Sequence, residues 1–523
     1  MEQKPPVFVR EATGLIREVG AWSSFMAVIA LVTGGVPVLW VATMYTAPGA
    51  NWPLAYFIAF LPTLLMAGMF TLIGMSMPRS GGDYVFTTRA VNPYIGFMNY
   101  WGVATAFILN LGIFSYYTGT YIGYVLAGLG AYYNSPSVAG LGTFLIEPYP
   151  SFALAAAVII ISSFLSMIRP RHTWGLVLYA GIISLVCTVI MFVALAGINQ
   201  TGFTSAYNSF MSNSTAYQAV ITMGGLTPPP DMMIATGAAL PFVWFAYTWY
   251  NLPTTWSGEM KNVKKSMPIA ILGSISAIAI YYIVFAVLVT HAFGQPFLDN
   301  WTSLAANGTA PIAGVGGFIP FFALLYYNSP ALYFIMFIGL WLPIFFEFPP
   351  LIISQTRYLF AWAFDRILPE KVASVSERFH TPIVATVLVT IAGVAAAGLM
   401  ALLPNSGEFA SLSFTMFSFG FIIPALAAVI FPFRKREIYE NSFVVKKKIG
   451  LPLLCWLGLG AAVYLIYSTW LANQSGTLPI DNFSITMYGT IYVLGAIVLV
   501  IGYFRARSKG LPLDLVFKEI PPE

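Results

Sequence analysis

One ionisable residue lies near the middle of a long apolar segment, and it is the first candidate for chemistry. This residue is Glu347, in the sequence Phe345-Phe346-Glu347-Phe348-Pro349-Pro350. Each proline lacks a backbone N–H and displaces the carbonyl four residues earlier, which frees the carbonyls of Phe345 and Phe346 beside the carboxylate. Acidic side chains at this depth are costly and by default functional. The segment predicts a site for a proton, a sodium ion or a substrate amine; the alternative is a protonated glutamic acid satisfied by a neighbouring helix.

Two other apolar segments are interrupted. One contains Thr33-Gly34-Gly35-Val36-Pro37, and the other contains Phe245-Ala246-Tyr247-Thr248-Trp249-Tyr250-Asn251-Leu252-Pro253. Glycine and proline weaken a helix, and a half-helix that begins at such a break aims the positive end of its dipole at an anionic group. Paired interruptions in two halves of a chain are the best sequence indication of a transporter's midplane site.

The scarcity of ionisable residues inside the apolar segments excludes several catalytic chemistries. An intramembrane aspartyl protease needs two buried carboxylates, a serine protease needs a base beside its nucleophile, and a metalloprotease needs a cluster of ligands. The sequence contains no P-loop, and Cys187 and Cys455 both lie in apolar runs, which leaves no disulfide framework or cysteine metal site. We therefore expect a carrier or a channel rather than an enzyme, with no cofactor and no metal.

The composition places these segments in a membrane. Of 523 residues 58% are apolar and 8% are charged, and the mean hydropathy is +0.79. A soluble protein carries roughly 25% charged residues because its surface must face water. A soluble enzyme, a disordered chain and a nucleic-acid binder are excluded, and the lipid bilayer is the expected surrounding.

Crossing the hydrocarbon core of a bilayer takes about 20 apolar residues in a helix. The apolar runs of this sequence are long and show no alternation of polar and apolar residues, which favours helices over β-strands. Runs of this kind occur twelve times: 21–46, 52–77, 95–129, 151–168, 173–198, 232–257, 268–293, 330–362, 382–403, 408–433, 450–472 and 485–504.

The charges predict the orientation. If both termini are cytoplasmic, all 24 Lys and Arg residues fall in inside segments, as the positive-inside rule requires. All N-x-[ST] glycosylation acceptors fall in outside loops: Asn199, Asn213, Asn300, Asn307, Asn473 and Asn482. The first twenty residues have no apolar core of a cleavable signal peptide. We expect a multi-pass plasma-membrane protein.

Three predicted cytoplasmic junctions resemble those of the amino acid–polyamine–organocation (APC) transporters. Met77-Pro78-Arg79-Ser80-Gly81-Gly82-Asp83-Tyr84-Val85-Phe86 follows span 2, and Gly258-Glu259-Met260-Lys261-Asn262-Val263-Lys264-Lys265-Ser266-Met267-Pro268 follows span 6. Thr356-Arg357-Tyr358-Leu359-Phe360-Ala361-Trp362-Ala363-Phe364-Asp365-Arg366-Ile367-Leu368-Pro369 and His380-Thr381-Pro382 follow span 8. These motifs occur in the family's order and cover spans 1–10.

The resemblance implies an all-α integral membrane protein with twelve transmembrane helices. Its fold would be the LeuT-type 5+5 inverted repeat plus two C-terminal helices. We expect a cytoplasmic segment 1–20, a transporter core 21–433 with repeats at about 21–198 and 232–433, spans 11–12 at 450–504, and a cytoplasmic tail 505–523. The implied function is secondary transport of amino acids or related amines.

Carried over residue by residue, the resemblance also implies a site. Phe245 corresponds to an aromatic lid, and Glu347 lies on the helix that lines the family's coupling-ion region. Trp249 stands where the family has glycine, Thr33 and Pro37 depart from the family's loop, and span 5 has no interior lysine. The predicted substrate-binding residues are Thr33, Gly34, Gly35, Val36, Phe245, Tyr247, Trp249 and Asn251.

The charged junction residues form the predicted cytoplasmic gate. They are Arg79, Asp83, Glu259, Lys261 and Arg357. We expect them to close the inward pathway rather than to touch the substrate, and the alternative is that they are solvated residues between helices.

Other functions remain open at this stage. A carrier of the same fold could move a polyamine or an organic acid, although acids for a polyamine are scarce. A channel would show repeated polar or charged rings, which the sequence lacks. A non-transporting sensor of transporter ancestry is a further alternative. The expected partner is a small-molecule substrate, and a homodimer formed through the last two helices is compatible with the sequence.

Overall fold

The computed structural model describes residues 14–212, 215–403, 406–442, 444, 447–448, 450–474, 482–510 and 516–517. Much of the predicted cytoplasmic segment 1–20 and of the predicted tail 505–523 therefore lies outside the described residues.

The described chain is almost entirely helical. Its first part contains α1 (Ala21–Thr33), α2 (Val36–Thr43), η1 (Met44–Thr46), α3 (Trp52–Ser76), α4 (Gly82–Ala90), α5 (Pro93–Tyr132), α6 (Pro136–Ile146), α7 (Pro148–Met167) and α8 (Pro170–Gly197). The middle contains α9 (Gln200–Phe210), α10 (Tyr217–Gly224), α11 (Met232–Ala246), η2 (Leu252–Thr254), η3 (Ser257–Glu259), α12 (Val263–Pro268), the π-turn η4 (Ile269–Gly273), α13 (Ser274–Phe293), α14 (Gln295–Ala306), α15 (Ile319–Tyr327) and α16 (Pro330–Phe364). The last part contains η5 (Glu370–Ala373), α17 (Ile383–Leu402), α18 (Ser406–Arg434), α19 (Arg436–Glu440), α20 (Leu453–Gln474) and α21 (Asn482–Ser508). Strands β1 (Lys447–Lys448) and β2 (Leu451–Pro452) pair antiparallel, Lys447 with Pro452.

Ten helices of the described chain are long and apolar enough to cross a membrane. They coincide with ten of the twelve predicted spans; α12 and α13 together make one of them, Val263–Phe293. The other two predicted spans, 21–46 and 232–257, contain the shorter helices Ala21–Thr33 and Met232–Ala246. These are the two segments whose sequences predicted an interruption.

Local sequence explains both interruptions. Helix α1 ends at Thr33, and Gly35 has a φ of 71°, a left-handed conformation that glycine adopts without steric cost. Pro37 then lies in the first turn of α2, where its missing N–H removes no helical bond. Helix α11 ends at Ala246, and the chain continues through a turn at 247–251, where Trp249 has a φ of 78°.

Helix α16 remains continuous despite its prolines. Pro343, Pro349 and Pro350 lie inside it, so the freed carbonyls expected beside Glu347 do not break the helix. Proline removes a hydrogen bond, but its φ of about −65° is helical, and packing against neighbouring helices can hold the segment straight.

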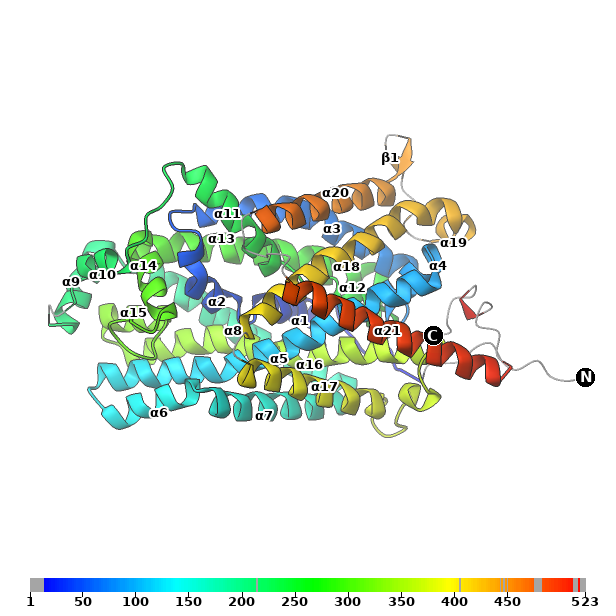
Figure 1. Ribbon diagram of the computed structural model, residues 1–523, viewed down its shortest axis with the longest axis horizontal. Coiled ribbons are helices and arrows are strands. Elements are labelled where there is room, and N and C mark those ends of the chain that lie inside the picture. The colour runs from blue at the N-terminus through cyan, green and yellow to red at the C-terminus, as the bar shows by residue number, and fades with distance from the viewer. Residues whose placement is uncertain are drawn as a thin grey trace, which may run out of the picture.

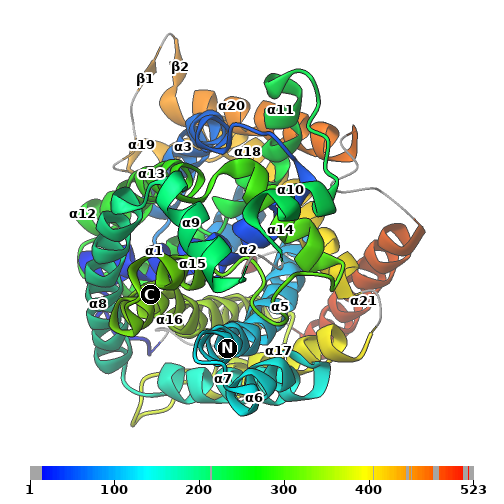
Figure 2. The same cartoon turned by 90° about the vertical axis from the view of Figure 1, so that its left-hand side faces the viewer.

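The long helices run roughly along one axis of the molecule (Figure 1). Helices α6, α9, α10, α14 and α15 gather at one end, and α4 and α19 lie toward the other, which we call the α4 end. Viewed along this axis, α1 and α2 lie inside the bundle, whereas α21 lies at its edge (Figure 2). The broken first span is therefore surrounded by other helices, as a site inside the bundle requires.

Candidate substrate and coupling site

Glu347 on α16 reaches the break between α1 and α2. Its side chain is fully buried, and neither carboxylate oxygen has a hydrogen-bond partner within the described part of the chain. A β-carbon added to Gly34 would overlap Glu347 Oε2 and would lie 2.7 Å from Glu347 Cδ. The missing side chain of Gly34 is therefore what lets the carboxyl group approach the backbone of the first break.

The chain itself already uses part of the polar backbone at this break. The N–H of Gly34 donates to the carbonyl of Ala30 (2.7 Å), and the N–H of Val36 donates to the carbonyl of Gly34 (2.7 Å). The Tyr121 hydroxyl donates to the carbonyl of Gly35 (2.7 Å). Of the three amides of Gly34, Gly35 and Val36, the one of Gly35 has no acceptor among the described residues.

Tyr282 on α13 joins the two broken segments. Its hydroxyl lies 2.5 Å from the carbonyl oxygen of Val32, in the last turn of α1, and 3.1 Å from that of Ala246, at the end of α11. One hydroxyl donor is thus shared by two helix C-termini, whose last carbonyls have no intrahelical partner. Nothing in the local sequence of α13 marks Tyr282, so this residue was not predicted.

A small cavity lies between the two breaks. Its volume is about 10 Å³, roughly the space for one water molecule. It is lined by Leu31, Val32, Val36, Phe114, Phe245, Ala246, Thr248 and Trp249. The only hydroxyl in this lining, that of Thr248, already donates to the carbonyl of Phe245 (2.7 Å). Three predicted substrate-binding residues, Val36, Phe245 and Trp249, meet here.

The other predicted substrate-binding side chains point elsewhere. The Thr33 hydroxyl donates to the carbonyl of Ile29 (2.7 Å), and Thr33 lines a separate cavity of about 160 Å³ between α1, α8, α13 and α16. The Tyr247 hydroxyl donates to the carbonyl of Tyr56 (3.2 Å). Asn251 faces the α4 end.

Two of the predicted gate residues form a buried ion pair. Arg357 Nε and Nη2 donate to the two carboxylate oxygens of Glu259 at 2.6 and 2.7 Å, and the two side chains are 3% and 2% exposed. The pair links α16 to η3, in the turn that follows the end of α11. A two-pronged bond of this type fixes the orientation of both partners.

Asp83 at the start of α4 forms a second contact between these elements. Its carboxylate accepts hydrogen bonds from Asn251 Nδ2 (3.1 Å), from the Tyr358 hydroxyl (3.1 Å) and from the Tyr84 N–H (3.0 Å). Burial raises the pKa of Asp83 to about 6. Asn251, predicted to bind substrate, therefore belongs to this polar cluster instead.

Arg79 and Lys261 contribute to the same region through their backbones. The Ser257 hydroxyl donates to the carbonyl of Arg79 (3.1 Å), and the N–H of Lys261 donates to the carbonyl of Val19 (3.1 Å). The predicted gate residues are thus gathered where α4, α16 and the turn after α11 meet.

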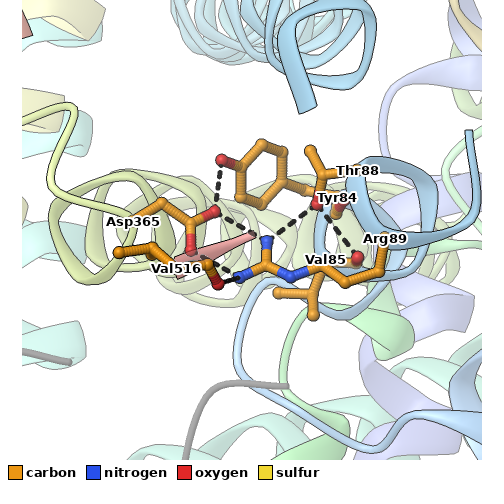
Figure 3. Close-up of polar contacts among 6 residues, drawn as sticks. All are labelled: Tyr84, Val85, Thr88, Arg89, Asp365 and Val516. Carbon is orange, nitrogen blue, oxygen red and sulfur yellow. Dashed lines mark hydrogen bonds and ion pairs between the residues drawn. The ribbon is translucent and has the colours of Figure 1, made fainter. Parts of the chain in front are cut away.

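A further ion pair, not predicted from the sequence, lies at the α4 end (Figure 3). Arg89 Nη2 lies 2.6 Å from Asp365 Oδ1, with both side chains 1% exposed, and the Tyr84 hydroxyl donates to Asp365 Oδ2 (2.6 Å). The carbonyl of Val516 also accepts from Arg89 (3.5 Å). Asp365 and Tyr84 both lie within the junction motifs, but no sequence signal pairs Asp365 with Arg89.

Comparison with known proteins assigns the chain to a family. The family model described as "Amino acid permease" matches residues 19–501. The chain is 23% identical to the branched-chain amino acid permease BcaP of Bacillus subtilis (strain 168), over 95% of this chain and 94% of that protein. It is 24% identical to the methylthioribose transporter of the same organism, over 88% and 91%, and 24% identical to its serine/threonine exchanger SteT, over 88% and 93%.

An all-helical bundle of apolar helices with a polar site at two helix breaks is the architecture of a multi-pass membrane transporter. The chain belongs to the amino acid permease family, within the amino acid–polyamine–organocation transporters. The family is one of permeases rather than enzymes, and its members handle small-molecule substrates in a lipid membrane.

Proposed function

We propose that the chain is a secondary active transporter that moves amino acids or related amines across the plasma membrane by alternating access. The family and the names of the relatives BcaP and SteT support this class of substrate. In this proposal the chain crosses the membrane twelve times, with both termini and the α4 end in the cytoplasm. Residues 21–198 and 232–433 are inverted repeats, and 450–504 lie outside them. One helix bundle rocks against another around the site between the two helix breaks.

One observation carries the proposal. Two interrupted helices meet inside the bundle, held by the Tyr282 hydroxyl, and a buried carboxyl group without a partner among the described residues lies against the first break. A buried polar group without a partner is costly, so a native protein keeps one where it has a use. A bound amine, proton or cation would satisfy Glu347.

The proposed roles follow from these positions. The N–H of Gly35, beside Gly34 and Val36, receives the carboxylate of the substrate. Phe245 covers the substrate from the outside. Glu347 takes up and releases a proton or pairs with the substrate amine.

The cytoplasmic gate closes the pathway between the substrate site and the cytoplasm, on the side opposite to Phe245. Arg357 and Glu259 are paired and buried, and Asp83 holds Asn251 and Tyr358. Release of substrate to the cytoplasm requires these contacts to separate. Water that enters then replaces the hydrogen bonds that are lost, which keeps the opening reversible.

Uptake into proteoliposomes tests the proposal. A mixed radiolabelled amino-acid set is offered with and without an inward proton gradient to the wild type, to Glu347→Gln and to Glu147→Gln, whose carboxylate is exposed. We expect gradient-driven uptake that Glu347→Gln lowers at least about tenfold and that Glu147→Gln leaves unchanged. Uptake indifferent to gradient and mutation would make Glu347 structural.

A second candidate function is carriage of a solute that is not an amino acid. The relative named methylthioribose transporter, which matches 88% of this chain, favours it. The same proteoliposomes discriminate the two, because amino acids would then neither enter nor compete with uptake of a thiosugar. Absence of flux for every solute would instead favour a sensor.

A further inference from the structure

A side chain of the protein itself fills the space between the two helix breaks. The indole of Trp249 is 3% exposed; its ring centre lies 5.0 Å from that of Phe114, edge to face, and 6.1 Å from that of Phe107. The cavity that remains is about 10 Å³. No amino acid fits between the breaks while the indole stays there.

The position of Trp249 is energetically unfavourable in two independent ways. Its φ of 78° lies in the left-handed region, which side chains other than glycine rarely adopt. Its Nε1–H is buried and has no acceptor within the described chain. Among the eight residues that line the cavity, Trp249 is the one that combines both features. Displacing this indole therefore breaks no hydrogen bond of its N–H within the described chain.

We propose that the Trp249 indole, in the conformation described here, occupies the place of a substrate's side chain, and that it leaves when a neutral amino acid with an apolar side chain binds. This inference rests on the proposed function, since it assigns the substrate class of the same site. The walls, Leu31, Val36 and Phe114 among them, are apolar. They suit an aliphatic or aromatic side chain and offer no partner to a charged one.

The proposal makes Trp249 a specificity-determining residue. A substrate gains the apolar contacts that the indole gives up, while the displaced indole can give its N–H a partner. A charged side chain would have to be desolvated against the same walls without compensation. Leucine is therefore expected to bind, and lysine and glutamate are expected to be excluded.

Intrinsic fluorescence tests the displacement directly. The purified full chain is titrated with leucine, lysine and glutamate, as wild type, Trp249→Phe and Trp341→Phe. Trp341 is the matched control, because its Nε1 is also buried without a partner among the described residues but the residue lies outside the cavity lining. We expect leucine alone to change the emission of the wild type and of Trp341→Phe, with the change lost in Trp249→Phe.

The affinity for leucine of two variants separates the effect of the indole ring from the effect of backbone strain at residue 249. Trp249→Ala removes the ring and keeps the side-chain penalty at positive φ, whereas Trp249→Gly removes both. We expect both variants to bind leucine about tenfold more tightly than the wild type, which corresponds to about 1.4 kcal/mol. Tighter binding by Trp249→Gly alone would overturn the proposal, because backbone strain would then account for the effect.

Two further results separate this inference from the proposed function. If the wild type binds leucine but its emission and affinity do not depend on Trp249, the displacement is wrong and the transporter assignment stands. If neither the wild type nor Trp249→Gly binds any amino acid, both are overturned.

Discussion

The contact between Glu347 and Gly34 is the tightest constraint in the candidate site. The two residues are far apart in sequence, yet the carboxyl group lies where a β-carbon of residue 34 would stand. Glycine at this position therefore leaves room for the one central carboxylate of the apolar segments.

Replacing Gly34 by alanine tests this contact. The added methyl group would overlap Glu347 Oε2 and approach the carbonyl oxygen of Ala30 to 2.7 Å, in a packed interior. Overpacking of this kind costs about 1–3 kcal/mol. We expect Gly34→Ala to lower the melting temperature and to reduce uptake at least about tenfold.

The matched control is Gly237→Ala on α11, where an added β-carbon meets open space. It is expected to keep wild-type uptake and melting temperature. If Gly34→Ala behaved like this control, Glu347 would not lie against the break.

The buried carboxyl group of Asp299 on α14 is expected to make the stability of the protein depend on pH. Its side chain is buried and accepts a hydrogen bond from the N–H of Gly49 (3.0 Å), and burial raises the pKa of its carboxyl group to about 7. A carboxyl group whose pKa is raised on folding stabilises the protein fully below its unfolded pKa of about 4. This contribution is lost as the pH rises from about 4 through 7.

We expect Asp299→Asn to remove this component of the pH dependence. The wild type should lose a few degrees of melting temperature between about pH 5 and 8, and the variant should lose less. Asp231→Asn, at an exposed helix cap, serves as control and should follow the wild type. Equal slopes for all three proteins would show that Asp299 is not the titrating group.

Between elements, the buried pair of Arg357 and Glu259 holds α16 against the turn that follows α11. Removing one partner of a buried pair leaves an uncompensated charge and costs about 3–5 kcal/mol, whereas replacing both by apolar residues is often neutral. We expect Arg357→Met and Glu259→Met each to lower the melting temperature strongly, and the double variant to recover most of the loss.

A thermal double-mutant cycle measures the coupling of this pair. Arg436→Met provides the comparison, because Arg436 and Glu440 on α19 form an exposed pair that should contribute little. Additive losses in the cycle would mean that Arg357 and Glu259 are not coupled.

For the whole molecule, the distribution of charge predicts the orientation in the membrane. The connections 199–231 and 294–329, which carry α9, α10, α14 and α15, contain no Lys or Arg. The positive-inside rule therefore predicts that this end lies outside and that the α4 end lies in the cytoplasm.

Cysteine labelling tests the orientation. In a background with Cys187 and Cys455 replaced by alanine, Ser205→Cys on α9 and Ser508→Cys at the end of α21 each add one exposed thiol. We expect a membrane-impermeant maleimide to label the Ser205→Cys variant in intact cells and the Ser508→Cys variant only after permeabilisation. The reverse pattern would invert the topology.

The sequence by itself determined the segments and their interruptions. Ten predicted spans coincide with long apolar helices, and the two segments with predicted breaks are those whose helices end early, at Thr33 and Ala246. Such features are local, because a bilayer sets the length of an apolar run and glycine or proline ends a helix within a turn. The junction motifs likewise identified the family.

Only the tertiary structure decided which residues meet. In the folded chain Glu347 lies against Gly34, and Asn251 donates a hydrogen bond to Asp83 rather than lining the cavity between the breaks. Arg89 pairs with Asp365, and the Tyr282 hydroxyl lies between the two breaks. These contacts join segments up to 313 residues apart (347 − 34), and no periodicity within a helix encodes them. The packing of whole helices fixes which polar groups face each other, so the sequence indicated the segments of the candidate site but not the contacts between them.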